Sequence, residues 1–141
     1  MRLWHHELIP YLSKEMLVSQ WRECIAIKRQ WEKGTLKHRL VSYVMNQKED
    51  IVFNSKQCFI SYVFKVKEEL KKRGIKYNPK YWNEMLEFCT PTSYAMCDYP
   101  EHDMRYLRQC YYNLQEKYDR GIVSKEEWEL IHKNIYGLIK E

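Results

Sequence analysis

Apolar residues recur at helical spacing in several separate segments of this 141-residue chain, and this repetition most constrains its fold. Between residues 104 and 118 the apolar positions are separated by steps of three and four, which is typical of one buried face of an α-helix. These positions are Met104, Leu107, Tyr111, Leu114 and Tyr118. Glycine and proline number only four each, too few turn-forming residues for a many-stranded sandwich or barrel. The sequence therefore predicts an all-α fold.

Capping residues and glycines delimit the expected helices. A side-chain oxygen before an apolar run can accept a hydrogen bond from the first helical turn, and glycine fits the left-handed position after the last turn. The expected long helices begin after Ser13, Asn54, Pro100 and Ser124, and the first three end at Gly34, Gly74 and Gly121. A short helix is expected around residues 81–88, and residues 1–12 are expected to be irregular. The stretch 35–50 fits a loop, a short helix or an edge strand.

The chain shows no long linker, low-complexity tract or internal repeat. Its length fits one domain with its own core. We therefore expect residues 1–141 to form one compact helical bundle, with the N-terminal segment packed near the first long helix.

Five cysteines, an odd number without a CxxC pair, predict reduced and buried thiols in a cytoplasmic protein. Cys89, Cys97 and His102 have a spacing that matches no usual zinc ligand pattern, so no metal is expected. The sequence has no apolar run of about 18 residues and no apolar stretch typical of a signal peptide, which predicts a soluble protein without a membrane partner.

The net charge of +5, from 24 basic and 19 acidic residues, would assist binding to a polyanion. An ordinary soluble protein can carry the same charge. The net charge therefore favours neither a nucleic-acid-binding protein nor one without such a partner. The P-loop, GxGxxG, HExxH and GxSxG motifs are absent, which removes the usual sequence evidence for nucleotide-binding enzymes, zinc proteases and serine hydrolases.

Arg22 and Glu23 are adjacent on the first expected helix, in "QWREC". Neighbouring helical side chains diverge by about 100°, so these two charges do not face one another. Each must have a separate target. From the residues alone, an ordinary ion pair with another basic side chain is the favoured interpretation for Glu23.

Several segments together resemble the pyrimidine-dimer DNA glycosylase family, of the phage endonuclease V type. The main match consists of "MRLW" at the start, then "PYL" and "LVSQWRE", and covers about thirty residues. Weaker similarity continues in "VKEELKKRGIKYNP" and "YPEHDMRYLRQCYYNL", to about residue 120. The motifs are unspecific singly, and their order and spacing carry the resemblance.

The resemblance implies a DNA repair glycosylase with abasic-site lyase activity and no cofactor. Family enzymes use the chain's own α-amine as the nucleophile, and Arg2 is too large for the usual removal of the initiator methionine, so Met1 would supply it. An unperturbed α-amine has a pKa of about 7.7–8.0, so roughly a tenth is neutral and nucleophilic at pH 7. Glu23 would stabilise the developing sugar cation and move protons.

The resemblance also implies a partner, double-stranded damaged DNA, bound by a protein that we expect to be a monomer. The expected DNA-contacting residues are Arg2, Arg22, Lys28, Arg29, Lys37 and Arg39. Trp4 and His5 are candidates for the base pocket, whereas Trp21 is expected in the core. Two alternatives remain: a nucleic-acid-binding domain of the same fold without catalysis, and a helical protein-interaction domain.

Overall fold

The computed structural model describes residues 1–91 and 96–140. In it, the three predicted side-chain caps at the starts of long helices are present. Ser13, Asn54 and Ser124 each accept a hydrogen bond from the backbone N–H three residues later, and so begin three helices. These helices are α1 (Lys14–Lys33), α2 (Ser55–Lys72) and α5 (Lys125–Ile139). The predicted helix starts are therefore confirmed.

Two further α-helices and two short 3-10 helices complete the described elements. They are α3 (Pro79–Cys89), α4 (Met104–Asp119), η1 (His6–Tyr11) and η2 (Ser42–Met45). The described residues contain no strand, so the all-α prediction is confirmed. Within residues 35–50 the structured part is the short helix η2. The expectation that residues 1–12 are irregular is wrong in part, because His6–Tyr11 form the 3-10 helix η1, which contains Pro10.

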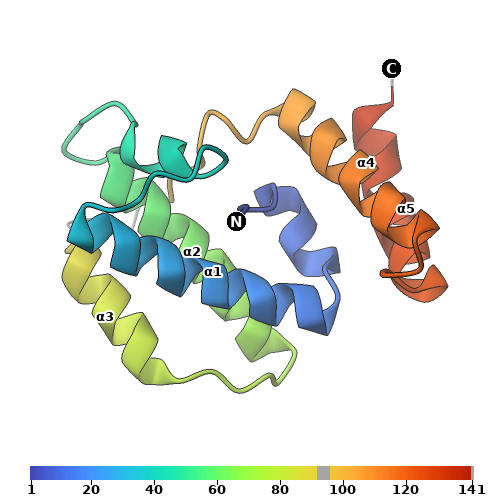
Figure 1. The fold of residues 1–141 in the computed structure, drawn as a ribbon, viewed down its shortest axis with the longest axis horizontal. Helices are drawn as coiled ribbons and strands as arrows, with labels where there is room; N and C mark the ends of the chain where they lie inside the picture. Colours follow the sequence, from blue (N-terminus) through green and yellow to red (C-terminus); the bar gives the residue numbers. More distant parts are fainter. Residues whose placement is uncertain (92–95, 141) are drawn as a thin grey trace.

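The helices form two groups with the N-terminal segment between them (Figure 1). One group consists of α1, α2 and α3, and in the other α4 packs against α5. The 3-10 helix η1 contacts both α2 and α5, so it joins the groups. Their buried apolar residues form one core, which includes Leu3, Leu17 and Phe59 at 0% exposure. None of the described helices has the length and apolarity needed to cross a bilayer.

Arg73, at the C-terminal end of α2, binds the last turn of η1 and the residue that follows it. Its guanidinium donates hydrogen bonds to the carbonyl oxygens of Leu12 at 2.7 Å and Pro10 at 2.9 Å. The Nε of Arg73 also pairs with Glu69 at 2.8 Å. These bonds attach the C-terminal end of the N-terminal segment, around residues 10–12, to α2.

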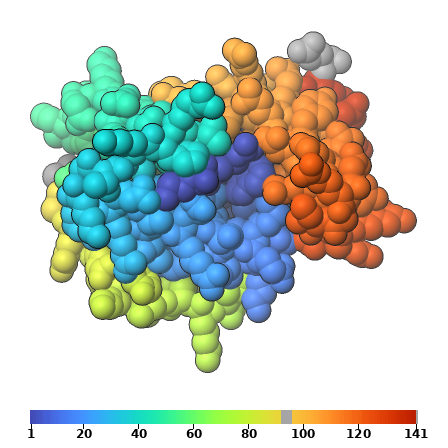
Figure 2. Space-filling model, in the orientation of Figure 1, coloured from blue at the N-terminus to red at the C-terminus, as the bar shows by residue number. Residues whose placement is uncertain are grey.

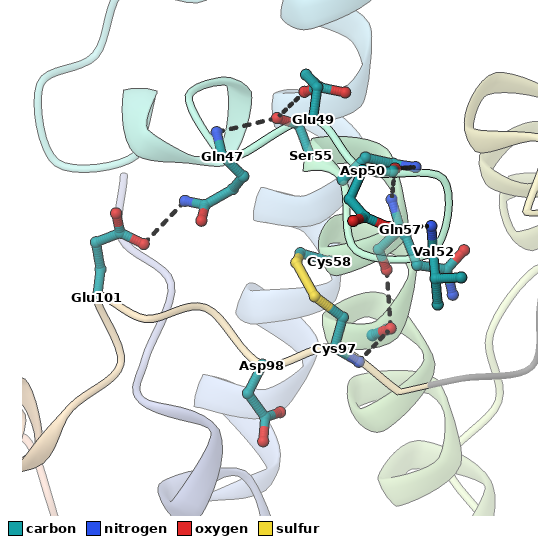
Figure 3. Close-up of a disulfide and its surroundings, with 12 residues drawn as sticks. Gln47, Glu49, Asp50, Val52, Ser55, Gln57, Cys58, Cys97, Asp98 and Glu101 are labelled. Carbon is teal, nitrogen blue, oxygen red and sulfur yellow. Dashed lines mark hydrogen bonds between the residues drawn. A yellow bond between two sulfur atoms is a disulfide. The ribbon is translucent and has the colours of Figure 1, made fainter.

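A disulfide joins Cys58 of α2 to Cys97 in the segment before α4, as Figure 3 shows. The expectation of five free thiols is therefore wrong for this pair, while Cys24, Cys89 and Cys110 are free and buried. The pairing arises because the fold brings two cysteines 39 positions apart in sequence to a Cα–Cα distance of 4.8 Å, which suits a disulfide.

The segment that contains Cys97 is attached to α2 by further contacts. The Cys97 N–H donates to Ser61 Oγ at 3.1 Å, and Asp98 pairs with Lys65. His102, at the end of the segment, bonds the Tyr43 hydroxyl at 2.7 Å. The start of α4 is thereby held against the first group of helices.

Three imidazole rings lie together where the two groups of helices meet. His5 is stacked with His6 at a centroid distance of 4.5 Å and with His102 at 5.4 Å. Burial, together with the neighbouring imidazoles, lowers the pKa of His5 to about 4 and that of His102 to about 3. Both rings are therefore neutral at pH 7 in the folded protein.

The buried histidines predict that the protein loses stability in mild acid. Below pH 6.5 the unfolded chain binds protons that the folded chain excludes until about pH 4, so the free energy of unfolding falls as the pH falls through this window. Each histidine accounts for about 2 kcal/mol between pH 7 and pH 5.

Urea unfolding at these two pH values measures the loss. His102→Gln keeps a hydrogen-bonding group for Tyr43 but cannot titrate, so its difference between pH 7 and pH 5 should shrink by about 2 kcal/mol. An undiminished pH dependence in His102→Gln would contradict the assignment.

Candidate active site

One row of side chains on α1 faces a cleft of about 730 Å³. Met16, Gln20 and Glu23 are spaced by four and three residues, so they lie on the same side of the helix. The opposite wall comes from α4 and the start of α5. Its residues include Asn113, Glu116, Lys117, Arg120 and Glu127. A volume of this size is within the usual range for ligand pockets.

The N-terminal residues form the third side of the cleft, and Figure 2 shows them at the surface between α1 and α4. Leu3 is fully buried, and this burial anchors the segment in the core by about 1.5–3 kcal/mol. The hydroxyl of Tyr106 donates to the Leu3 carbonyl at 2.5 Å, and that of Tyr62 donates to the Trp4 carbonyl at 2.5 Å. Met1, Arg2 and Trp4 all line the cleft.

Glu23 lies in the same cleft as Met1. Its carboxylate is half-buried, and the Oε2 atom is fully buried without a hydrogen-bond partner. An acceptor left unpaired in this way costs about 1–3 kcal/mol, so most buried polar atoms are paired. Glu23 is thus not held in a structural ion pair through this oxygen.

Arg22, the neighbour of Glu23, is exposed and does not line the cleft. The two adjacent charges therefore have separate surroundings, as the helical geometry predicts. Three other basic residues expected to contact DNA, Arg29, Lys37 and Arg39, are also exposed. Arg39 is close to the cleft in sequence, because the next residue, Leu40, lines it.

Lys28 differs from these residues because it is buried, with 8% exposure. Its amine pairs with Glu32 at 3.2 Å and lies 5.9 Å from the centre of the Phe88 ring. A contact with a phosphate group would require Lys28 to leave these partners. We therefore do not include it in the proposed DNA surface.

Trp4 and His5, adjacent in sequence, lie on different sides of the N-terminal segment. The ring of Trp4 lines the cleft, and the guanidinium of Arg2 lies 5.2 Å from its centre. His5 is 4% exposed, accepts a hydrogen bond from the Glu7 N–H, and belongs to the buried imidazole group. The structure thus brings Trp4 to the cleft and leaves His5 behind it.

Basic side chains from α4 border the cleft and a second hollow of about 560 Å³ beside it. Arg2 lines both hollows, Lys117 and Arg120 line the first, and Arg105 and Arg108 line the second. The lining of the cleft carries charges of both signs, because Glu15, Glu116 and Glu127 also line it. Cationic groups from α4, together with Arg2, therefore border one side of the site, where Arg120 pairs with Glu116 at 3.8 Å.

Arg120 and Gln20 are among the cleft residues that the sequence did not single out. Arg120 lies one turn after Lys117, and this spacing of three residues is a sequence feature that could have identified it. Gln20 precedes Glu23 by the same spacing. It is buried, with 2% exposure, and a polar residue on an otherwise apolar side of a helix is the feature that could have singled it out.

A primary amine and a carboxylate in one cleft can perform imine chemistry at a sugar carbon. The amine supplies the nucleophile, and the carboxylate stabilises positive charge and transfers protons. Within residues 1–91 and 96–140, no group of three or more His, Cys, Asp or Glu side chains is arranged to hold a metal ion.

Comparison with known proteins identifies the family of this chain. The family model described as pyrimidine dimer DNA glycosylase matches residues 1–83, a range that includes the N-terminal segment, α1 and α2. Searches of the curated proteins and of the solved structures found no match. Because the matched range covers more than half of the chain, the protein belongs to the pyrimidine dimer DNA glycosylase family.

Proposed function

We propose that this protein removes damaged pyrimidines from duplex DNA and then cuts the strand at the resulting abasic site, through an imine on the α-amine of Met1. The observation that carries the proposal is the presence of Met1 and Glu23 in one cleft, with the Glu23 Oε2 buried and unpartnered. Membership of the family supports the glycosylase activity and a damaged-DNA substrate. The imine and the strand cleavage are our inference from the site.

In the first step, the neutral amine attacks C1′ of the damaged nucleotide. The bond between C1′ and the base breaks, and the base leaves with the bonding electrons and takes up a proton. The sugar ring then opens to give an imine between C1′ and the Met1 nitrogen. Glu23 stabilises the positive charge that develops on the sugar, and transfers the protons between the amine and the ring oxygen.

In the second step, a proton leaves C2′ and the bond from C3′ to the 3′ phosphate oxygen breaks. This β-elimination cuts the strand, and water then hydrolyses the imine and restores the amine. Neither an oxidant nor a reductant is needed. The Glu23 carboxylate is the candidate base for the C2′ proton, because it lines the cleft that holds the amine.

The damaged duplex would lie across the cleft, with its phosphates along the basic border of α4. The exposed Arg22, Arg29, Lys37 and Arg39 would supply further contacts to phosphates outside the cleft. Trp4 lines the cleft and would stack on an unpaired base. Extrusion of a nucleotide costs least where the duplex is already damaged, which favours lesions over intact DNA.

Glu23→Gln should reduce single-turnover cleavage of UV-irradiated duplex by roughly 10²–10⁴-fold, because the amide cannot accept or donate the transferred protons. The thermal unfolding midpoint should not fall, since Oε2 has no partner to lose. Glu15→Gln is the matched control, because Glu15 lines the same cleft two turns away on α1 and should cleave normally. Full activity in Glu23→Gln would remove this carboxylate from the mechanism.

An extension of two glycines before Met1 should abolish imine formation, because the amine would then lie outside its place in the cleft. Borohydride reduction of the enzyme–DNA mixture, followed by gel electrophoresis, measures the covalent complex. The same two residues added after Glu141 serve as the control and should leave trapping intact. Equal trapping by both extended forms would refute Met1 as the nucleophile.

Lys117→Ala and Arg120→Ala should each weaken duplex binding and flatten its salt dependence. If each side chain neutralises one phosphate, the slope of log K against log salt should decrease by about 0.9 per residue. Lys133→Ala, which removes an exposed charge on α5 outside the cleft, should leave the slope unchanged. Unaltered slopes in both cleft variants would place the DNA on another surface.

Salt-dependent binding without cleavage in the wild type would instead indicate a non-catalytic DNA-binding domain.

A further inference from the structure

We propose that Gln20 is a positioning residue, which binds the main chain of the N-terminal segment and thereby holds the Met1 amine on the side of α1 that carries Glu23. The proposal rests on the proposed function, because it concerns the placement of that nucleophile. It assigns a role to a side chain that does not itself react.

Gln20 is 2% exposed, and both its Nε2 and its Oε1 atoms form hydrogen bonds with the segment. Its Nε2 donates a hydrogen bond to the Arg2 carbonyl at 2.9 Å, and its Oε1 accepts one from the Trp4 N–H at 2.9 Å. The Oε1 atom also lies 3.3 Å from the Tyr62 hydroxyl oxygen, whose single hydrogen is donated to the Trp4 carbonyl at 2.5 Å. A single amide thus binds main-chain groups on both sides of Leu3.

These bonds match the alternation of an extended chain, in which main-chain groups two residues apart point the same way. The groups of Arg2 and Trp4 meet Gln20, whereas the carbonyl of Leu3, between them, meets the Tyr106 hydroxyl of α4. The segment is therefore held from both sides. Because the bonded atoms belong to the main chain, they fix the path of the backbone that leads to the amine.

Gln20 and Glu23 lie on adjacent turns of one rigid helix, and side chains at this spacing have Cβ atoms about 5–6 Å apart. Met1 is the next residue beyond the Arg2 carbonyl that Gln20 binds. The helix therefore presents, one turn apart, the amide that holds the chain and the carboxylate that acts beside the amine. The position of an α-amine is set by the main chain and not by a side-chain rotamer. It therefore depends on the bonds that hold the main chain of Arg2 and Trp4.

Gln20→Met tests the proposal, because methionine has a similar length and volume but cannot hydrogen-bond in this way. Three quantities are measured: the single-turnover rate of borohydride trapping on an abasic duplex at saturating protein, the Kd for a duplex with an uncleavable abasic analogue, and hydrogen exchange of the Trp4 amide. Gln30→Met is the matched control, since it makes the same replacement on α1 outside the cleft.

The proposal predicts that Gln20→Met traps about 100-fold more slowly, because a small displacement of a reacting group has an effect of this size. The Kd should change by less than about threefold, so that the loss lies in the chemical step. The Trp4 amide should exchange faster. Gln30→Met should match the wild type in all three measurements.

Trapping at the wild-type rate in Gln20→Met would overturn the positioning role and leave the proposed function intact. An equal loss in Kd and in trapping would also overturn it, because the residue would then act in DNA binding. If the wild type traps no DNA, the proposed function and the positioning role both fail.

If Gln20→Met does not unfold cooperatively, the double variant Tyr62→Phe/Tyr106→Phe decides the question. It removes the hydroxyl groups that bind the carbonyls of Trp4 and Leu3 and preserves both aromatic rings. Slower trapping at unchanged Kd supports the attachment of the segment as the basis of catalysis, and unchanged trapping refutes it.

Discussion

The attachment of the first four residues between α1 and α4 is the constraint on which the rest of the site depends. The α-amine that we propose as the nucleophile has no side chain to place it, so its position depends on the backbone that carries it. Burial of Leu3 anchors the segment, hydroxyl groups of α2 and α4 bind its carbonyls, and Arg73 holds the chain beyond η1. The two groups of helices therefore meet around the chain terminus, and the cleft is a consequence of this arrangement.

Local chemistry explains why much of the helical fold could be predicted. Side-chain caps and left-handed glycines act within a few residues, and Gly34, Gly74 and Gly121 do adopt φ values of +71°, +69° and +78°. Features that depend on contacts between distant segments escaped prediction. The bond between Cys58 and Cys97 is one such feature, because neither cysteine stands in a recognisable pattern and only the packed fold brings them together.

The candidate site was predictable to the extent that it depends on adjacency along the first helix. The spacing of Arg22 and Glu23 predicted separate targets, and the resemblance to the family singled out Glu23 and the N-terminus. The far wall could not be deduced in the same way, since α4 and α5 lie beyond the range that the family model matches. The position of Lys28 was equally hidden, because charge alone does not reveal that this side chain packs over Phe88.

The central claim is that the amine of Met1 forms the bond to DNA, and it can be tested by locating that bond. Tag-free protein would be reduced with borohydride on UV-irradiated duplex, and the adduct mapped by protease digestion and mass spectrometry. Irradiated DNA is preferable to an abasic duplex, since many amines can react with an exposed aldehyde. The account predicts a nucleotide adduct on the N-terminal α-amine. An adduct on a lysine side chain, or no adduct at all, would contradict it.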